Sequence, residues 1–475
     1  MNLIEHFIDG KIVSGTSDRK GKVFNPAIGK QESEVRLGTK QDLDLAVQKA
    51  KKAFETWSNV TPIQRARIIF KYKEIIEKNS DLLAKMIVSE HGKVYEDAKG
   101  SLTRGLEVVE FACGIPQMLK GDFTENVGTN IDSWSVRQPL GVCAGITPFN
   151  FPAMVPMWMF PMAIACGNTF ILKPSEKDPS CSLRLAQLLK EAGLPDGVFN
   201  VVNGDKEAVD TLLHDERIKA VSFVGSTPIA EYIYTTANAN GKRCQALGGA
   251  KNHAIVMPDA DMENAVAQLL GAAFGSSGER CMALSVAVAV GDEAGDALVA
   301  KMSEAMQSLN VGPYHDKNND FGPVITQQHK DKVCGYIDSA ADQGATIVVD
   351  GREPPIEGQE QGFYVVVPLI DTVTADMESY KAEIFGPVLQ VVRVADMQAA
   401  MDLIDAHEYG NGTCIFTRDG EAARYFSDHI QVGMVGINIP LPVPVAYHSF
   451  GGWKRSLFGD LHAYGPDGVR FYTKR

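Results

Sequence analysis

The sequence predicts an α/β protein with two doubly wound α/β domains and a small β hairpin. From Gly141 onwards, short apolar strands alternate with helices, a pattern typical of a parallel sheet covered on both faces. The same alternation begins again near His253. The length of 475 residues is also too great for one ordinary domain and indicates two or three.

The part before Gly141 is expected to be mainly helical. A strand-like segment lies at 7–13, and the apolar spacing predicts helices at 41–57, 61–79, 82–90 and 96–114. Residues 126–138 alternate apolar and polar side chains and predict a strand excursion, a β segment outside the body of the domain, that ends at Pro139. An isolated hairpin needs a surface to pack on, which another subunit could supply.

Two β-α blocks form the rest of the chain. In the first, strands are predicted at 141–147, 169–173, 199–202 and 220–224, with helices at 154–166, 181–192, 206–214 and 228–237. In the second, strands are predicted at 254–257, 284–290, 346–349, 364–369, 388–392, 413–416 and 434–437. Its helices are predicted at 262–274, 295–309, 327–343, 397–407 and 420–430. The segment 469–473 could be a strand that pairs with the excursion.

Composition excludes several classes of partner. The formal charge of −13 argues against nucleic acid, because phosphate binding needs a basic surface. The hydrophobic stretch 141–171 is interrupted by prolines and asparagines, so it indicates a buried core and not a membrane span. The eight cysteines form no CxxC pair, which favours neither a metal site nor a disulfide framework. With no signal peptide recognisable, we expect a cytoplasmic enzyme.

The turn 275–283 carries the strongest candidate for catalysis. It places Cys281 between a predicted helix and a buried strand, among Gly and Ser residues that leave the thiol accessible. Arg280 beside it favours the thiolate, the nucleophilic form. A buried structural cysteine is the competing interpretation, and the turn alone makes the two about equal.

Other polar residues follow predicted strands, where ligands of α/β sheets bind. There is no GxGxxG, but Gly225 and Ser226 end one strand and open a helix whose amides could receive a pyrophosphate. Lys173 and Glu176 end another strand and offer a cation and a carboxylate to a ribose. Ordinary turns and helix caps would explain both motifs equally well.

Two further segments combine polar and aromatic residues next to buried strands. The first, 146–152, contains Thr147, Phe149 and Asn150, and the amide of Asn150 is either a structural cap or a donor to a developing oxyanion. The second, 383–387, contains Glu383 and Phe385 just before a strand. Glu383 is either a surface acid or a clamp on a sugar diol.

Taken together, these segments resemble the aldehyde dehydrogenase superfamily. The motifs TPFNFP, ILKPSE, FVGS, GGAKN, ERC, EIFGPV and SFGGWKRS occur in matching order between Gly141 and Ser456. The resemblance implies a homotetramer or homodimer with a Rossmann-like NAD-binding domain (1–119 and 139–246), a catalytic domain (247–459) and oligomerisation segments (120–138 and 460–475). It implies no metal.

The resemblance also assigns roles to individual residues. It makes Cys281 the nucleophile, with Asn150 and the Cys281 backbone amide as the oxyanion hole. It gives NAD contacts to Thr147, Phe149, Lys173, Glu176, Gly225, Ser226, Glu383 and Phe385. A carboxylate at position 176 near the ribose mildly favours NAD over NADP, because it repels a 2′-phosphate.

One departure from the family pattern concerns the acyl acceptor. Hydrolytic members carry a glutamate before the glycine pair, where alignment on Gly249 places Leu247, and neither Ala246 nor Gly248 would supply a carboxylate. Leucine cannot activate water, so coenzyme A becomes the expected acceptor. A hydrolytic NAD(P)-dependent enzyme with a relocated base, for which Glu279 is the nearest carboxylate in sequence, is the alternative. A non-catalytic relative and a cysteine hydrolase are more distant alternatives.

Segments 149–176 and 248–261, with the turn at Cys281, resemble the acylating branch of methylmalonate-semialdehyde dehydrogenases. The resemblance implies oxidative decarboxylation of a small carboxylated aldehyde, methylmalonate or malonate semialdehyde, to propionyl-CoA or acetyl-CoA. The substrate carboxylate would need a cation, for which Arg104 and Arg280 are the candidates. An ion pair with Glu107 on the helix surface is the competing interpretation of Arg104.

Overall fold

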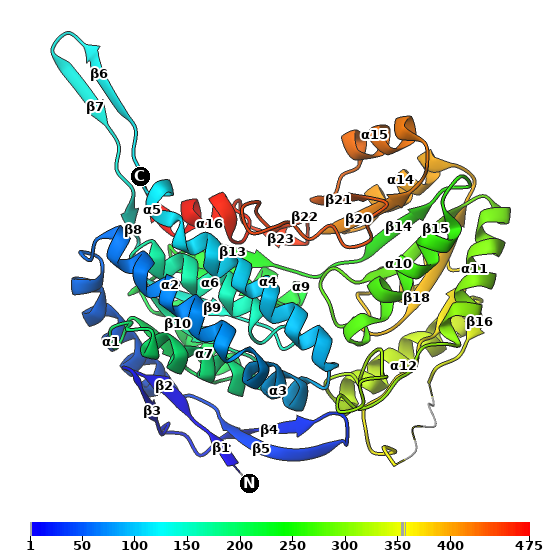
Figure 1. Ribbon diagram of the computed structural model, residues 1–475, viewed down its shortest axis with the longest axis horizontal. Helices are drawn as coiled ribbons and strands as arrows, with labels where there is room; N and C mark the ends of the chain where they lie inside the picture. The colour runs from blue at the N-terminus through cyan, green and yellow to red at the C-terminus, as the bar shows by residue number, and fades with distance from the viewer. Residues whose placement is uncertain (1, 353–355, 357) are drawn as a thin grey trace.

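The computed structural model describes residues 2–352, 356 and 358–475. Within these residues the chain forms two α/β lobes, and a narrow hairpin projects from the first of them (Figure 1). The first lobe is built on an eight-stranded sheet and the second on a seven-stranded sheet. This arrangement confirms the predicted fold class. No helix in the described part of the chain is long and apolar enough to cross a membrane.

The first sheet has its sequence order reversed at β9, its central strand. Strands follow the spatial order β23-β13-β12-β9-β10-β11-β2-β3, so β10 and β12 flank β9 on opposite sides. The parallel strands are β9 (Val142–Ile146), β10 (Thr169–Lys173), β11 (Phe199–Val201), β12 (Ile218–Val224) and β13 (Arg243–Leu247). Antiparallel edges are formed by β2 (His6–Ile8), β3 (Lys11–Val13) and β23 (Leu457–Phe458). Ligand sites of such sheets lie where the strand order reverses, which places the segment after β9 at the expected position.

Strand β13 is absent from the sequence prediction. Its side chains Cys244 to Leu247 are all buried, but the segment is short and carries the polar Gln245, so no alternation marks it. Its pairing with β23 means that Leu247 and the late segment Leu457–Phe458 both belong to the first sheet.

Helices cover both faces of the first sheet. The most enclosed is α6 (Met154–Ala165), whose residues are all buried because it lies between the sheet and the long helix α4 (Tyr95–Cys113). The others are α1 (Lys40–Trp57), α2 (Pro62–Lys78), α3 (Ser80–His91), α5 (Ile115–Met118), α7 (Ser180–Glu191), α8 (Lys206–His214) and α9 (Thr227–Ala239).

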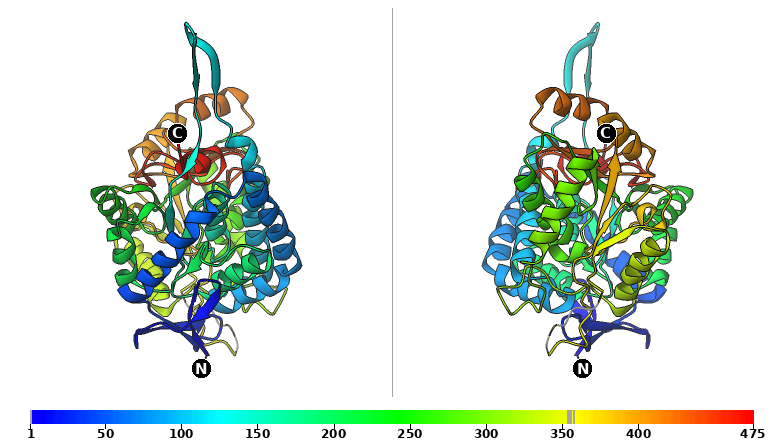
Figure 2. Two further views of the ribbon diagram at one scale, coloured as in Figure 1. Left: turned by 90° about the vertical axis from the view of Figure 1, so that its left-hand side faces the viewer. Right: turned by 90° about the vertical axis from the view of Figure 1, so that its right-hand side faces the viewer.

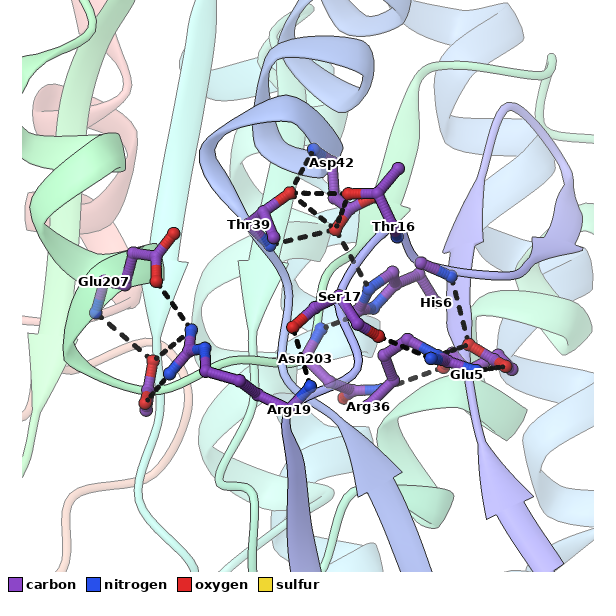
Figure 3. A network of polar contacts seen from close by, with 12 residues as sticks. Glu5, His6, Thr16, Ser17, Arg19, Arg36, Thr39, Asp42, Asn203 and Glu207 are labelled. Carbon is purple, nitrogen blue, oxygen red and sulfur yellow. Dashed lines mark hydrogen bonds and ion pairs between the residues drawn. The ribbon is translucent and has the colours of Figure 1, made fainter.

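A small sheet at the N-terminus was not predicted from sequence. It contains β1 (Asn2–Ile4), β4 (Lys20–Asn25) and β5 (Lys30–Arg36), whose polar composition hides the strand pattern. A polar network holds this region to the first sheet (Figure 3). In it, the backbone amide of Asn203 donates to Nδ1 of the buried His6 at 3.2 Å, and Arg36 forms an ion pair with Glu5 at 2.8 Å.

The second lobe repeats the same plan. Its sheet has the order β16-β17-β18-β15-β14-β20-β21, with only the edge strand β16 antiparallel. The strands are β14 (Asn252–Val256), β15 (Leu284–Val290), β16 (Thr346–Val349), β17 (Leu369–Asp371), β18 (Leu389–Val394), β20 (Gly412–Phe416) and β21 (Met434–Ile437). The strand predicted at 364–369 is wrong: residues 363–368 form no ladder, and the strand starts at Leu369.

The five helices predicted for this lobe are present: α10 (Met262–Phe274), α11 (Asp292–Met306), α12 (Gln327–Asp342), α14 (Met397–Ala406) and α15 (Gly420–His429). The short helix α13 (Glu378–Lys381) was not predicted. A two-stranded ladder of β19 (Tyr409–Gly410) and β22 (Trp453–Lys454) connects the C-terminal segment to this lobe.

The predicted excursion is an exposed hairpin. Strands β6 (Phe123–Gly128) and β7 (Ile131–Trp134) stand clear of the body in all three views (Figures 1 and 2). At its base, β8 (Gln138–Pro139) pairs with β24 (Thr473–Lys474), so the predicted pairing with the C-terminus occurs there.

The strand predicted at 469–473 is wrong over most of its length. Residues Gly465–Phe471 form helix α16, and the chain becomes a strand only at Thr473. Val469 and Tyr472, one helical turn apart, are both buried, and the hydroxyl of Tyr472 lies 2.8 Å from that of Ser222. Packing against α6 and the first sheet therefore stabilises a helix, and not a strand, in this segment.

Candidate active site

The turn that carries Cys281 has a left-handed backbone held by specific contacts. It joins α10 to β15, and Ser276 and Ser277 have φ values of 51° and 56°. A carboxylate oxygen of Asp97 accepts hydrogen bonds from the Ser276 amide (2.9 Å) and hydroxyl (3.0 Å). The Ser277 hydroxyl donates to the carbonyl of Gly322 at 2.6 Å. Such strained positions persist only where the surroundings hold them, as these contacts do.

The Cys281 residue itself is anchored from the second lobe. Its carbonyl oxygen accepts hydrogen bonds from the side-chain amides of Asn252 (3.0 Å) and Asn411 (2.9 Å). Asn252 begins β14 and Asn411 precedes β20, so two neighbouring strands fix the turn. Cys281 is partly exposed, whereas six of the other seven cysteines, all except Cys334, are buried.

Cys281 lines a cavity of about 620 Å³ between the two lobes. The first lobe contributes residues of α4 and of the segment 151–158, and the second contributes the turn at 276–282. The wall is largely apolar, and its charged members are Glu96, Asp97, Arg104 and Arg280. A cavity with apolar walls and few charged groups suits a small ligand that carries one anionic group.

Arg280 lowers the pKa of Cys281, which is the direction expected from the sequence, but other causes outweigh it. Burial, and next the carboxylate of Glu383, raise the pKa of Cys281 to about 12, and Arg280 lowers it by less. The Arg280 guanidinium forms an ion pair with Asp97 at 2.7 Å. The thiol is therefore protonated at neutral pH until other groups enter the site.

Both arginines predicted to recognise a carboxylate line this cavity. Arg280 is 18% exposed and carries the Asp97 ion pair, which also links it to Ser276. Arg104 forms the ion pair with Glu107 at 2.7 Å that was its competing interpretation, and it also donates to the carbonyls of Val443 and Pro444, each at 3.2 Å. Arg104 therefore forms the helix-surface ion pair with Glu107 and also lines the cavity, so the two interpretations of this residue are compatible.

Asn150 lies in the segment that follows the central strand β9, as predicted. It is buried, and within the described residues its side-chain Oδ1 has no hydrogen-bond partner. Its backbone carbonyl accepts a hydrogen bond of 2.6 Å from Nζ of Lys93. The next residue, Phe151, lines the cavity with Cys281. Thr147, in the same segment, is also buried with an unpartnered hydroxyl in the described part of the chain.

Glu383 and Phe385 reach the site from the second lobe. Together with Cys281 they line a small hollow beside the turn. Glu383 accepts a hydrogen bond from the amide of Ala250 at 2.9 Å, and burial raises its pKa to about 7. Phe385 has φ of 59°, and its ring lies against that of Phe149 from the first lobe.

The strand ends of the first sheet carry the predicted nucleotide contacts. Nζ of Lys173 lies 3.2 Å from a carboxylate oxygen of Glu176, at the carboxyl end of β10. Burial tends to raise the pKa of Glu176, but Lys173 and a backbone amide lower it below its usual value. Gly225 and Ser226 open α9, and the Ser226 side chain does not cap the helix. The first amides of α9 can therefore serve a phosphate.

Leu247 and Glu279, the two positions that bear on water activation, are both buried. Leu247 is buried at the end of β13. Glu279 is fully buried and accepts a hydrogen bond from the amide of Ile325, with His91 and His329 each 3.7 Å away. Its contacts are thus to the loop at 325 and to α3 and α12, and it does not line the cavity.

Several residues that shape the site were missed from the sequence. Asp97, Asn252, Asn411 and Lys93 all hold the catalytic segments through hydrogen bonds. They are distant in sequence from the residues they hold, so no local pattern identifies them. Within the described residues, no group of His, Cys, Asp or Glu side chains is arranged to hold a metal ion.

Comparisons with known proteins agree with this geometry. The model of the aldehyde dehydrogenase family matches residues 12–475. A malonate-semialdehyde dehydrogenase of Pseudomonas aeruginosa is 60% identical over 475 residues, which cover 100% of this chain and 95% of that protein. The crystal structure of the methylmalonate-semialdehyde dehydrogenase from Oceanimonas doudoroffii is similar with a TM-score of 0.99 and 71% identity, covering 100% of this chain and 97% of that one.

A second solved structure contains a nucleotide. It is a candidate methylmalonate-semialdehyde dehydrogenase from Sinorhizobium meliloti 1021 in complex with NAD, with a TM-score of 0.99 and 55% identity. The match covers 100% of this chain and 96% of that one.

Proposed function

We propose that this chain, which belongs to the aldehyde dehydrogenase family, oxidises malonate semialdehyde or methylmalonate semialdehyde with NAD and coenzyme A. The products are acetyl-CoA or propionyl-CoA, carbon dioxide and NADH. The observation that carries the proposal is the cavity in which Cys281 lies together with two arginines, Arg104 and Arg280. The names of the relatives at 60% and 71% identity support the same substrates.

The strand ends of the first lobe fit NAD. The buried, unpartnered hydroxyl of Thr147, the charged pair of Lys173 and Glu176, and the start of α9 at Gly225 and Ser226 offer donors and acceptors to a dinucleotide. Glu383, with Phe385 and Phe149, would hold the second ribose from the other lobe. NAD, when bound, supplies the hydride acceptor for the oxidation. Residues 1–119 and 139–246 are therefore proposed as the NAD-binding domain, and 247–459 as the catalytic domain.

The chain's own residues provide the covalent chemistry. After losing its proton, Cys281 attacks the aldehyde carbon and forms a tetrahedral adduct. The amide of Asn150 and the backbone amide of Cys281 stabilise the oxyanion of this adduct. Once the adduct has been oxidised, Cys281 carries a thioester, and Arg104 and Arg280 hold the substrate carboxylate.

The thioester also permits decarboxylation. The carboxylate is attached to the carbon next to the thioester, so the electron pair left by departing carbon dioxide is delocalised as an enolate. A proton from solvent completes the acyl group. The thiol of coenzyme A then attacks the acyl carbon and releases Cys281 as the leaving thiol.

The choice of coenzyme A over water follows from the missing base. Leu247 offers no proton acceptor at the position of the family's glutamate, and Glu279 does not line the cavity with Cys281, so neither of these two positions supplies the base that activates water in hydrolytic members. The experiment is NADH formation with malonate semialdehyde in rapid mixing. Without coenzyme A, we expect about one NADH per active site and then near arrest, and with coenzyme A, continuous turnover. Fast continuous turnover without coenzyme A would instead support the hydrolytic alternative that yields a free acid.

Assembly and location complete the proposal. The apolar hairpin β6–β7, together with β8 and the C-terminal segment, would join copies of the chain into a homodimer or homotetramer. We place the enzyme in the cytoplasm, where NAD and coenzyme A are both available.

A further inference from the structure

Lys93 is a fully buried lysine that lies directly behind the Asn150 segment. It follows the C-terminal end of α3, and its side chain is 0% exposed. Nζ donates a 2.6 Å hydrogen bond to the backbone carbonyl of Asn150 and lies 4.4 Å from the ring centroid of Phe151. Within the described residues, no ion pair joins this ammonium to a carboxylate. Lys93 thus contacts the peptide between the predicted oxyanion donor and a residue of the cavity wall.

A buried ammonium of this kind is unfavourable for folding unless it is compensated. Burial lowers the pKa of Lys93 to about 8. The charged groups that face it are Asp97 on α4, Arg280 and Glu279 on the turn that carries Cys281, and Asp178 after β10. Their compensation is weak, because Arg280 already pairs with Asp97, and burial raises the pKa of both Glu279 and Asp178.

Within the described residues, one polar atom of the Asn150 side chain is buried without a partner. Its Oδ1 is buried without a hydrogen-bond partner in the described part of the chain, so no contact at that atom holds the amide group. The hydrogen bond from Lys93 to the Asn150 carbonyl holds the peptide that precedes Phe151. Because it is a charge-assisted bond in a buried setting, it is stronger than a neutral one.

We propose that Lys93 is a positioning residue of the oxyanion hole, whose ammonium holds the Asn150–Phe151 peptide and thereby orients the Asn150 amide toward the reacting carbonyl. This inference rests on the proposed role of Asn150. It also explains why the fold keeps an ammonium with weak compensation beside the site, since buried charges tend to persist where they serve function.

The test is a double-mutant cycle of Lys93→Met and Asn150→Ala, read as the rate of the first NADH burst. We expect Lys93→Met to slow the burst by about 10- to 100-fold, less than the roughly 10²- to 10³-fold loss that follows removal of an oxyanion donor itself. In the Asn150→Ala background, the same substitution should change the rate by less than about 3-fold, because the two residues act as a unit. Alkylation of Cys281, which needs no oxyanion hole, should be unchanged within about 2-fold.

Additive losses from the two substitutions, or an unchanged burst in Lys93→Met, would overturn the proposal. An unchanged burst in Asn150→Ala would instead reject the proposed role of Asn150, so the two failures are distinguishable. Lys242→Met is the matched control, because Lys242 is also buried and donates to backbone carbonyls, but at the start of β13. It should lower stability without slowing the burst.

The variant Lys93→Arg distinguishes the effect of the charge from that of packing, and it provides the test if Lys93→Met does not fold. Arginine stays protonated at all accessible pH values, so Lys93→Arg should restore much of the burst rate. In the wild type, the Lys93 contribution is present below its pKa and is lost as pH rises through about 8. Lys93→Arg should therefore decline less between pH 8 and pH 9.5 than the wild type. Identical alkaline profiles would contradict a role for the ammonium.

Discussion

The ring of Phe149 meets the ring of Phe385 edge to face, with centroids 6.0 Å apart and planes at 90°. Phe149 follows the central strand of the first sheet, and Phe385 precedes β18 of the second, so this contact joins the two lobes beside the site. Nζ of Lys177 lies 4.8 Å from the Phe149 ring centroid. The contact also sets the distance from Glu383 to the strand ends of the first lobe, because Glu383 is two residues before Phe385.

Glu383 should control the reactivity of Cys281 in the free enzyme. Because burial and the Glu383 carboxylate raise the pKa of Cys281 to about 12, alkylation by iodoacetamide should keep rising with pH beyond 9. Glu383→Gln removes the second cause, so it should speed alkylation at pH 8 by several-fold. Intact-protein mass spectrometry measures the rate, and exposed Glu378→Gln is the control. An alkylation profile that levels off near pH 8.5 would contradict the raised pKa.

Removal of the thiol should abolish the reaction. Cys281→Ala should lower the rate of NADH formation by about 10³-fold or more, since no other group can form the thioester. Cys334→Ala is the matched control, because Cys334 is also partly exposed but lies on α12, away from the cavity, and should leave the rate unchanged. Substantial turnover by Cys281→Ala would reject covalent catalysis by this residue.

Arg104 should discriminate between charged and uncharged aldehydes. Arg104→Gln should lower kcat/KM for malonate semialdehyde by about 10²-fold, because a carboxylate in the cavity loses a charge-assisted partner. It should change kcat/KM for propanal by less than about 3-fold. Steady-state kinetics with both aldehydes make the comparison, and equal losses for both would show that Arg104 only supports the fold.

Arg280 should behave differently from Arg104. Its ion pair with Asp97 also supports the left-handed turn at Ser276, since the same carboxylate binds both. Arg280→Gln should therefore slow oxidation of propanal as well as malonate semialdehyde. A loss confined to the carboxylated substrate would make Arg280 a recognition residue alone.

The hairpin should carry self-association. Val127, Ile131 and Trp134 are 59%, 59% and 71% exposed on β6 and β7. Exposed apolar side chains on an isolated hairpin need a covering surface. Ile131→Asp should shift the mass measured by light scattering toward that of the monomer, whereas Ile63→Asp, an exposed position on α2, should not. An unchanged mass for Ile131→Asp would place the interface elsewhere.

Strand and helix order was largely predictable because burial patterns are local. The apolar runs of β9, β10 and β15 and the amphipathic helices appear in the sequence itself. The N-terminal sheet could not be predicted, because β4 and β5 are polar and their pairing depends on a network around His6 and Arg36. Helix α16 was mistaken for a strand because docking on α6 overrides the propensity of a short segment.

The site shows the same division between local and long-range information. Cys281, Asn150 and Glu383 stood out as polar or reactive residues next to buried strands. The raised pKa of Cys281 did not, because it arises from burial in the folded chain and from Glu383, which is distant in sequence. Lys93 was also missed, since its partner Asn150 lies 57 positions away.

A protonated Cys281 should be oxidised more slowly in the idle enzyme than a thiolate would be. Hydrogen peroxide attacks thiolates and converts them through sulfenic acid to irreversible sulfinic and sulfonic acids. A catalytic cysteine with a low pKa would be exposed to this inactivation between turnovers. With its pKa raised to about 12, Cys281 waits in the form that oxidants attack slowest.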